Sequence, residues 1–273
     1  METIGVAVST TGHEHRMGFL ETCVRAWLDI EVPPIVTVDG DQADVDRVGA
    51  LVGGMVPVYR VGQPERGSGR RLGVAANKNT GIELLMEKDA NHIFLCDDDT
   101  WPKNRTALNY HMSLGTKPHS MVNWGRHRAG AIDAEWKWPR SVHLYAHQKV
   151  IEQAGGMIEA FGLGGHEHVE WSRRIHQMGL TTTDFPAPPY MKFDNGLGAH
   201  RFWHAEDMPR FDRRRIEPLG DLRQRRRNIT SVDRPGDYWE NAEQIMRKMD
   251  GAPEFVPFRA NENVRESATM YRS

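Results

Sequence analysis

The stretch HIFLCDDDTWP, residues 92–102, decides the fold. It opens with a short, mostly apolar run, which is typical of a strand buried within a parallel sheet. The run leads directly into three consecutive carboxylates, Asp97, Asp98 and Asp99. Ligands of open α/β sheets bind at the carboxyl ends of the strands. The sequence therefore predicts that these three side chains emerge at a binding site.

Apolar runs and helical patterns alternate along the rest of the chain. Upstream, strands are predicted over residues 4–9, 34–38 and 56–60, and helices over 17–29, 43–52 and 74–88. Downstream, weaker patterns predict strands over 121–125 and 140–146, and helices over 147–155, 168–179 and 238–249. Strands that alternate with helices across short connections indicate an α/β fold with a mostly parallel sheet.

The composition excludes several classes of protein. The 273 residues are 39% hydrophobic, enough for a substantial core, and the net charge of −2 is not that of a polycation. No apolar run approaches the roughly 20 residues that cross a bilayer, so no membrane insertion is expected. The start, METIGVAVSTTGHEH, resembles a first strand more than a signal peptide. With only Cys23 and Cys96 there is no disulfide framework, and we expect a cytoplasmic protein.

The three carboxylates suggest a metal site. Side chains two residues apart, such as Asp97 and Asp99, can both reach a hard divalent ion such as Mg²⁺ or Mn²⁺, which commonly completes its shell with phosphate oxygens. Three adjacent carboxylates also repel one another unless a cation or solvent compensates. The alternative is a solvated acidic turn in which Asp99 or Thr100 caps a following helix.

With this cluster in place, the chain resembles the GT-A glycosyltransferases, particularly their family-two-like and galactosyltransferase-like branches. The matching pieces occur in the family's order: the first strand IGVAVST, the Asp39-Gly40 pair, the segment 73–82 before the acidic strand, the D-x-D of residues 97–99, the Gly-Gly-acidic segment 161–174, and the late His of segment 201–207. The resemblance implies a Rossmann-like, mixed sheet flanked by helices. It covers about residues 3–208, so we expect a catalytic domain over 1–208 and an Arg-rich helical extension over 209–273.

The resemblance also implies roles for particular residues. The divalent metal, Mn²⁺ or Mg²⁺, would be held by Asp97, Asp99 and His204, with His200 as the rival imidazole. The nucleoside diphosphate-sugar donor, expected to be a UDP-sugar, would contact Thr10, Thr11, Asp39, Arg71, Asn77, Lys78 and Asp98. From the residues alone, Asp39 could equally be a turn residue, and Arg70 and Arg71 could belong to a solvated basic loop, because GSGRRLG lacks the ending of a P-loop.

The candidate base is a glutamate in segment 161–174. The resemblance places the base of the inverting enzymes at Glu167, directly after Gly164-Gly165 and His166, and Glu170 is the alternative. Family members often carry consecutive acids where this chain has His166-Glu167-His168, which leaves the base open. Glu167 could instead be a helix N-terminal carboxylate that interacts with the helix dipole.

Two segments bear on the acceptor. Trp124, with Trp136 and Trp138, could stack on a sugar or a base, or could simply be packed. Residues 210–227 hold eight Arg, including Arg213, Arg214 and Arg215, against three acidic residues, a local charge of +5. Such a strip could grip the backbone of DNA that carries a hydroxylated base, as in a viral-type enzyme, or it could be a salt-bridged helix or lid. Protein and glycan acceptors stay open.

Two other functions compete with glycosyl transfer. A sugar-nucleotide nucleotidyltransferase would also combine an α/β sheet with an acidic metal site, but usually has a Gly-rich loop after the first strand, where TTGHEHR has one Gly. A non-catalytic nucleic-acid-binding module on a transferase scaffold would explain the Arg strip but not the intact carboxylates.

Overall fold

The computed structural model describes residues 2–61, 71–102, 104–105, 108–109, 112, 119–122, 143–159, 167–180, 202–204 and 256. Within these residues one sheet organises the chain. Its strands, in spatial order, are β3 (Val58–Arg60), β2 (Ile35–Val38), β1 (Ile4–Thr10), β4 (His92–Asp97), β7 (His143–His147) and β6 (His119–Val122). The first four are mutually parallel, and β7 runs antiparallel to both of its neighbours. The expected mixed, mostly parallel α/β sheet is confirmed.

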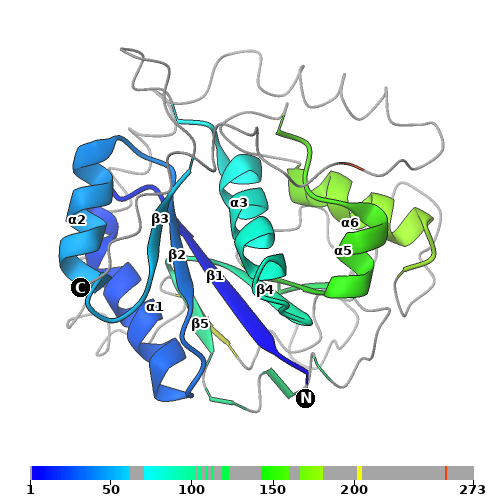
Figure 1. The fold of residues 1–273 in the computed structure, drawn as a ribbon, viewed down its shortest axis with the longest axis horizontal. Helices are drawn as coiled ribbons and strands as arrows, with labels where there is room; N and C mark the ends of the chain where they lie inside the picture. Colours follow the sequence, from blue (N-terminus) through cyan, green and yellow to red (C-terminus); the bar gives the residue numbers. More distant parts are fainter. Residues whose placement is uncertain are drawn as a thin grey trace, which may run out of the picture.

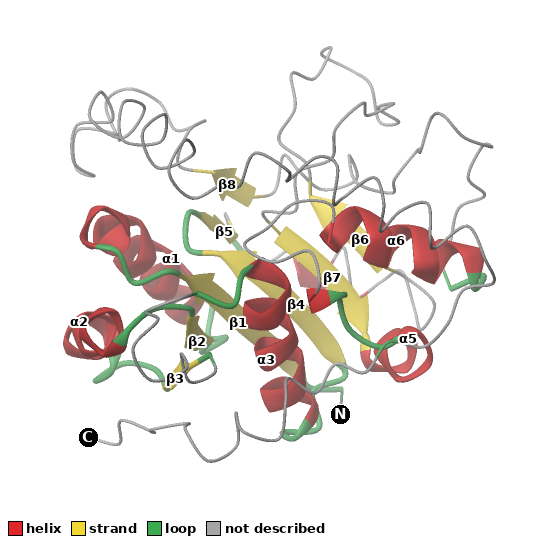
Figure 2. Cartoon of the chain, turned by 90° about the horizontal axis from the view of Figure 1, so that it is seen from above, coloured by secondary structure: helices red, strands yellow, loops and turns green. Residues whose placement is uncertain are grey.

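Helices cover both faces of this sheet (Figures 1 and 2). One face carries η1 (Glu14–Arg16), α1 (Met17–Asp29) and α2 (Gln42–Val52), and the other carries α3 (Val74–Met86), α5 (Gln148–Ala154) and α6 (Glu167–Gln177). Each predicted strand and helix in the described ranges is present within a few residues of its expected bounds. The predicted helix over 238–249 lies outside the described residues.

Alternation along β1 and β4 divides the core into two layers. Val6, Val8, Phe94 and Cys96 pack against α1 and α2, whereas the residues between them pack against α3, α5 and α6. Successive strand residues point to opposite faces. Consequently, Asp97 and Asp98 leave the end of β4 toward opposite faces of the sheet, the first toward α3 and the second toward η1.

A second, two-stranded sheet follows the aspartates directly. β5 (Thr100–Pro102) pairs antiparallel with β8 (Phe202–His204), and Thr100 is opposite His204. The reading of Asp99 or Thr100 as the cap of a following helix is therefore wrong, because the chain continues as a strand. The long-range pairing of β5 with β8 overrides the local turn chemistry.

Close packing joins α3 to the centre of the sheet. Gly81 of α3 faces β1, and a Cβ added there would lie 2.6 Å from the Cβ of Ala7. This approach holds the start of α3 against the carboxyl ends of β1 and β4.

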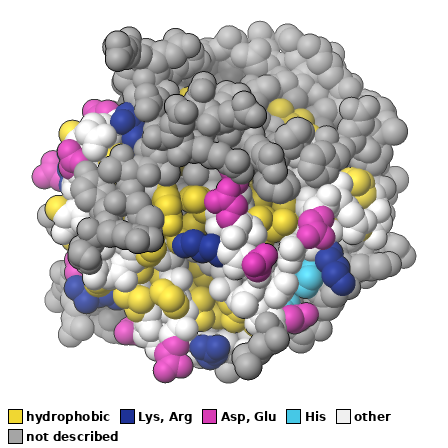
Figure 3. Space-filling model, in the orientation of Figure 1, with side chains coloured by type: hydrophobic (Ala, Val, Ile, Leu, Met, Phe, Trp, Pro, Cys, Tyr) yellow, Lys and Arg dark blue, Asp and Glu magenta, His cyan; other side chains and the backbone are white. Residues whose placement is uncertain are grey.

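Figure 3 shows the surface of the molecule in the orientation of Figure 1. The acidic and basic side chains of the described residues are interspersed there and not gathered into one charged region. Both cysteines are free and buried, as expected.

Among the residues described, none of the helices combines the length and the apolar character that crossing a membrane requires. Of the expected extension over 209–273, the structure describes Val256, which forms a parallel bridge with Gly155.

Candidate active site

The three aspartates after β4 are held by different parts of the chain. Asp97 accepts a hydrogen bond from Nζ of Lys78 on α3 at 2.7 Å. The Lys78 side chain is fully buried, whereas 32% of the Asp97 side chain is exposed. Burial raises the pKa of Asp97, and the Lys78 ammonium opposes that rise. Asp97 is therefore a partly exposed carboxylate with a buried ammonium fixed beside it.

Asp98 and Asp99 both face Arg16, the last residue of η1. Asp98 accepts from Nε of Arg16 at 3.1 Å and from Nη2, and Asp99 lies 3.1 Å from the same Nη2. Both carboxylates are buried. Burial disfavours the charged form of Arg16, but the attraction of Asp98 and Asp99 outweighs it and raises the pKa of the guanidinium.

Arg16 is a site residue that the sequence interpretation missed. A signal was present, because Arg16 follows the first predicted strand by a few residues and strand order places that strand beside the acidic one. The length of the loop TTGHEHR did not reveal which of its side chains would turn back toward residues 97–99.

Thr10 and Asn77 connect the ends of β1, β4 and α3. Oγ1 of Thr10 donates to Asp98 at 2.6 Å and accepts from the backbone N–H of Gly12 at 3.1 Å. The amide nitrogen of Asn77 donates to the carbonyl of Thr10 at 3.1 Å. The amide oxygen of Asn77 is buried and has no hydrogen-bond partner within the described part of the chain. Thr11 beside them is half-buried.

Asp39 at the end of β2 organises the backbone that enters α3. Its two oxygens accept from the N–H groups of Leu72 at 2.9 Å and Gly73 at 2.8 Å. Gly73 has a φ of 105°, a conformation that favours glycine. Burial raises the pKa of Asp39, opposed by the two backbone hydrogen bonds and by the charge of Arg71. Asp39 and Arg71 thus lie at the same edge as Asp97.

The two candidate bases on α6 have different partners. Oε1 of Glu167 lies 2.9 Å from Nδ1 of His168, and Glu167 is buried in the first turn. Both oxygens of Glu170 are bonded by Arg174, at 2.6 Å from Nε and 3.1 Å from Nη2. Arg174 also donates to the carbonyls of Ala154 and Gly156. Glu170 therefore belongs to a buried clamp that fixes α6.

Several expected site residues fall outside the description. The backbone of His204 lies opposite Thr100, beside the aspartates, and its side chain is not described. Arg70, Gly164, Gly165, His200 and the expected acceptor residues lie outside the described residues; those acceptor residues are Trp124, Trp136, Trp138, Arg213, Arg214 and Arg215.

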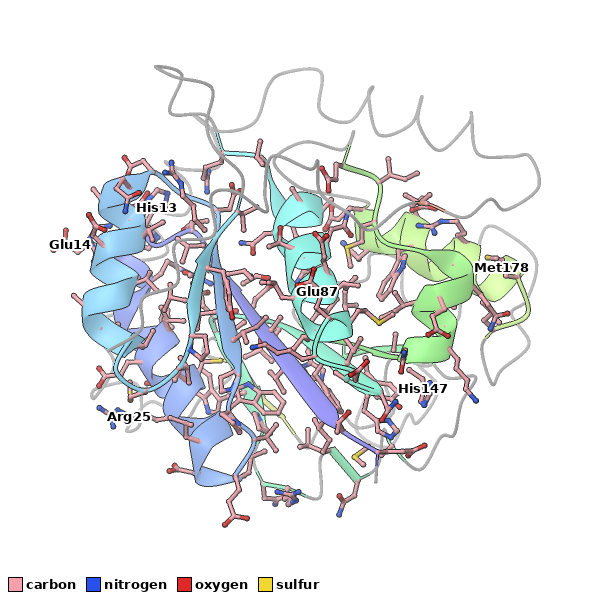
Figure 4. All side chains as sticks on the ribbon, in the orientation of Figure 1. His13, Glu14, Arg25, Glu87, His147 and Met178 are labelled. Carbon is pink, nitrogen blue, oxygen red and sulfur yellow. The ribbon has the colours of Figure 1, made fainter. Side chains whose placement is uncertain are left out.

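A second group of potential ligands lies at the opposite edge of the sheet. Glu2, His92 and His147 bring one ligand atom each within 4.8 Å of one another. His92 bonds to Glu2 at 2.8 Å, and Nδ1 of His147 accepts the N–H of Lys149 at 3.1 Å, which caps α5. Because that nitrogen is an acceptor, the proton of neutral His147 is on its other ring nitrogen. Figure 4 places His147 far from Glu14 of η1. We interpret this group as a structural cluster that joins strand ends.

The sequence matches no protein-family model and no curated protein. Solved structures are similar in fold. One is the galactosyltransferase LgtC in complex with donor and acceptor sugar analogues, at 16% identity and a TM-score of 0.34, over 53% of this chain and 58% of that one. This chain thus spans a little over half of that protein's length.

Two further solved structures match over larger shares of both chains. Glucosyl-3-phosphoglycerate synthase from Mycobacterium tuberculosis, in complex with Mg²⁺ and UDP, is 14% identical over 66% of this chain and 67% of that one, with a TM-score of 0.44. A putative glucose-1-phosphate thymidylyltransferase from Bacillus anthracis is 10% identical over 73% of this chain and 93% of that one, with a TM-score of 0.40.

Proposed function

We propose that the chain is a divalent-metal-dependent glycosyltransferase that moves a sugar from a nucleoside diphosphate, expected to be UDP, to an acceptor hydroxyl. The observation that supports it is the meeting of Asp97, Asp98 and Asp99 with Thr10 and Lys78 at the carboxyl edge of a mostly parallel sheet. Nucleotides bind at this edge in open α/β folds.

The donor set fits a hard divalent cation. Carboxylate oxygens are the ligands that Mg²⁺ and Mn²⁺ prefer, and the Asp97 side chain is 32% exposed, so that an ion from solvent can reach it. Asp97 and Asp99 would hold the ion, with His204 as a further ligand, since its backbone pairs with Thr100. When bound, the ion would neutralise charge on the leaving diphosphate.

The donor would lie along the same edge. Asp39 is the candidate for the nucleobase or ribose, and Arg71 and Lys78 are candidate cations for the diphosphate. The remaining candidate contacts to the donor are Thr10, Thr11, Asn77 and Asp98. The buried, unsatisfied amide oxygen of Asn77 supports this assignment, because such an atom is expected to find a partner when a ligand binds.

Glu167 is the proposed base. The acceptor oxygen attacks the anomeric carbon, the bond from that carbon to the diphosphate oxygen breaks, and the nucleoside diphosphate departs with the bonding electrons. Glu167 receives the hydroxyl proton, and the anomeric centre inverts. Glu170 is the weaker candidate because Arg174 occupies both of its oxygens. His168 orients Glu167 through the contact at 2.9 Å.

The proposed catalytic domain covers 1–208, with residues 209–273 as an extension. The Arg-rich segment 210–227 supports a hydroxylated base in DNA as one acceptor class, with protein or glycan hydroxyls as the others. A cytoplasmic location fits such an acceptor, in a bacterial host if the enzyme is viral.

The test is to incubate the protein with a panel of nucleotide sugars and Mn²⁺ and to identify the released phosphorus species by ³¹P NMR. Release of a nucleoside diphosphate that stops on chelation supports the proposal. A parallel incubation contains a nucleoside triphosphate and a sugar phosphate, and release of pyrophosphate there identifies a nucleotidyltransferase instead. Retention of DNA without turnover of any donor identifies a binding module.

The matched variants are Asp99→Asn and Arg25→Gln. Asp99→Asn should abolish turnover, because it removes a proposed ligand. Arg25→Gln removes an exposed charge on α1 and should leave turnover unchanged. Full activity of the Asp99 variant in the presence of a chelator would end the metal proposal.

A further inference from the structure

Arg16 forms the densest set of contacts at the acidic triplet. It reaches both oxygens of Asp98 and one oxygen of Asp99. Its guanidinium also lies over the ring of Phe19, with 5.8 Å between the guanidinium carbon and the ring centroid, and 21% of its side chain is exposed. An arginine whose planar guanidinium is held by two carboxylates and by the face of a ring is a positioned cation and not a solvated one.

Two cations of the chain therefore already compensate the triplet. Lys78 pairs with Asp97, and Arg16 pairs with Asp98 and Asp99. A divalent ion at Asp99 would be a few ångströms from the fixed charge of Arg16. Like charges at that separation in a buried setting repel strongly.

We infer that Arg16 is an internal counter-ion that competes with the divalent metal for Asp99, so that the metal binds well only together with the donor diphosphate. The inference rests on the metal site of the proposed function. The diphosphate supplies the negative charge that satisfies both cations, and its oxygens pair with Nη2 of Arg16 when that nitrogen leaves Asp99. Arg16 stays on Asp98, which Thr10 also holds.

Competition of this kind couples the two ligands. Without a nucleotide, the metal must displace Nη2 of Arg16 from the buried Asp99 carboxylate, while Arg16 stays on Asp98. With the diphosphate present, the displaced guanidinium gains a new anionic partner. The affinity for metal then rises when nucleotide binds, and by linkage the affinity for nucleotide rises by the same factor when metal binds.

The experiment is a titration with Mn²⁺ alone, followed by the electron paramagnetic resonance signal of the free ion. Arg16→Gln removes the charge and should tighten Mn²⁺ binding about tenfold or more, as expected for loss of a unit charge close to the ion. Arg25→Gln changes the net charge of the protein equally and should leave the affinity within about twofold of the wild type, because Arg25 is exposed and pairs with Glu21.

The titration is repeated with saturating UDP. UDP should tighten Mn²⁺ binding in the wild type by a larger factor than in Arg16→Gln. Unchanged Mn²⁺ binding in Arg16→Gln without UDP would overturn the inference. Weaker binding would overturn it too, because it would show that Arg16 holds the metal ligands in place and does not compete with the metal. Absence of Mn²⁺ binding in both proteins would overturn it as well.

Arg16→Lys keeps the inference testable if Arg16→Gln does not fold. A compact ammonium keeps the charge but cannot bridge Asp98 and Asp99 as a planar fork does. Its Mn²⁺ affinity should lie between those of the wild type and Arg16→Gln, and an affinity equal to the wild type would refute competition. Failure of the proposed function alone would give a different result. Replacing Arg16 would still change the affinity for Mn²⁺, but the protein would cleave no nucleotide sugar.

Discussion

The buried clamp on α6 allows a quantitative test of how burial sets the contribution of an ion pair to stability. Arg174 pairs with Glu170 four residues earlier, and both side chains are at most 3% exposed. Arg25 pairs with Glu21 on α1 at the same spacing, but their side chains are 60% and 38% exposed. The two pairs share residue types and helical geometry and differ in burial.

Replacing Arg174 with Met removes the charge and keeps most of the volume. It leaves the Glu170 carboxylate buried without its cation and removes the donor to the carbonyls of Ala154 and Gly156. Breaking a buried pair in this way costs about 3–5 kcal/mol of the free energy of unfolding. For a chain of this size that corresponds to a fall in the midpoint of thermal unfolding on the order of 6–20 °C.

Arg25→Met is the matched control. An exposed pair at this spacing contributes about 0.3–0.5 kcal/mol, so its midpoint should fall by no more than about 2 °C. Urea denaturation and thermal melts of the wild type and both variants provide the comparison. Similar losses in the two variants would refute the reasoning. The double variant Glu170→Gln/Arg174→Met should recover part of the loss, because no charge is left buried.

Three further predictions test the close packing, the histidine cluster and the base. Gly81→Ala should cost about 1–3 kcal/mol in urea denaturation, because its Cβ would meet Ala7 at 2.6 Å, whereas Gly54→Ala, with open space around it, should cost far less. Burial lowers the pKa of His147 below its ordinary value of 6.5, so the unfolded chain takes up the proton first and stability falls as the pH drops below that value. His147→Asn keeps a good N-cap and should lose this pH dependence in thermal melts between pH 7 and pH 5. If the melting midpoint of the variant changes with pH as in the wild type, another group causes the dependence. Glu167→Gln should keep donor affinity, measured by calorimetry, and lower transfer by about 10²–10⁴-fold, and normal transfer would place the base elsewhere.

The strands and helices near the site were predictable because their patterns are local. The apolar run before Asp97 identified a central strand, and the alternation of strands and helices identified a parallel sheet with Asp39 and Asp97 at the same carboxyl edge. Helix α3 was predicted around Asn77 and Lys78. These inferences need only hydrophobic periodicity and the rule on strand ends.

The contacts within the site were not predictable in the same way. Thr10 and Asp98 are 88 residues apart, and Arg16 and Asp98 are 82 residues apart, so their pairing depends on tertiary structure. Strand β5 was missed because residues 100–102 include a proline and resemble a turn. The resemblance favoured Glu167 over Glu170 as the base, and the partner of Glu170, Arg174, became known only from the structure.

The strand order has a consequence for synthesis. Strand β1 lies inside the sheet, between β2 and β4, yet it is synthesised before the other described strands of this sheet. While the nascent chain contains β1, β2 and β3 alone, the edge of β1 that later receives β4 offers its unpaired backbone to other chains. Such edges promote aggregation, so the interval before residues 92–97 emerge is when a chaperone would benefit this protein most.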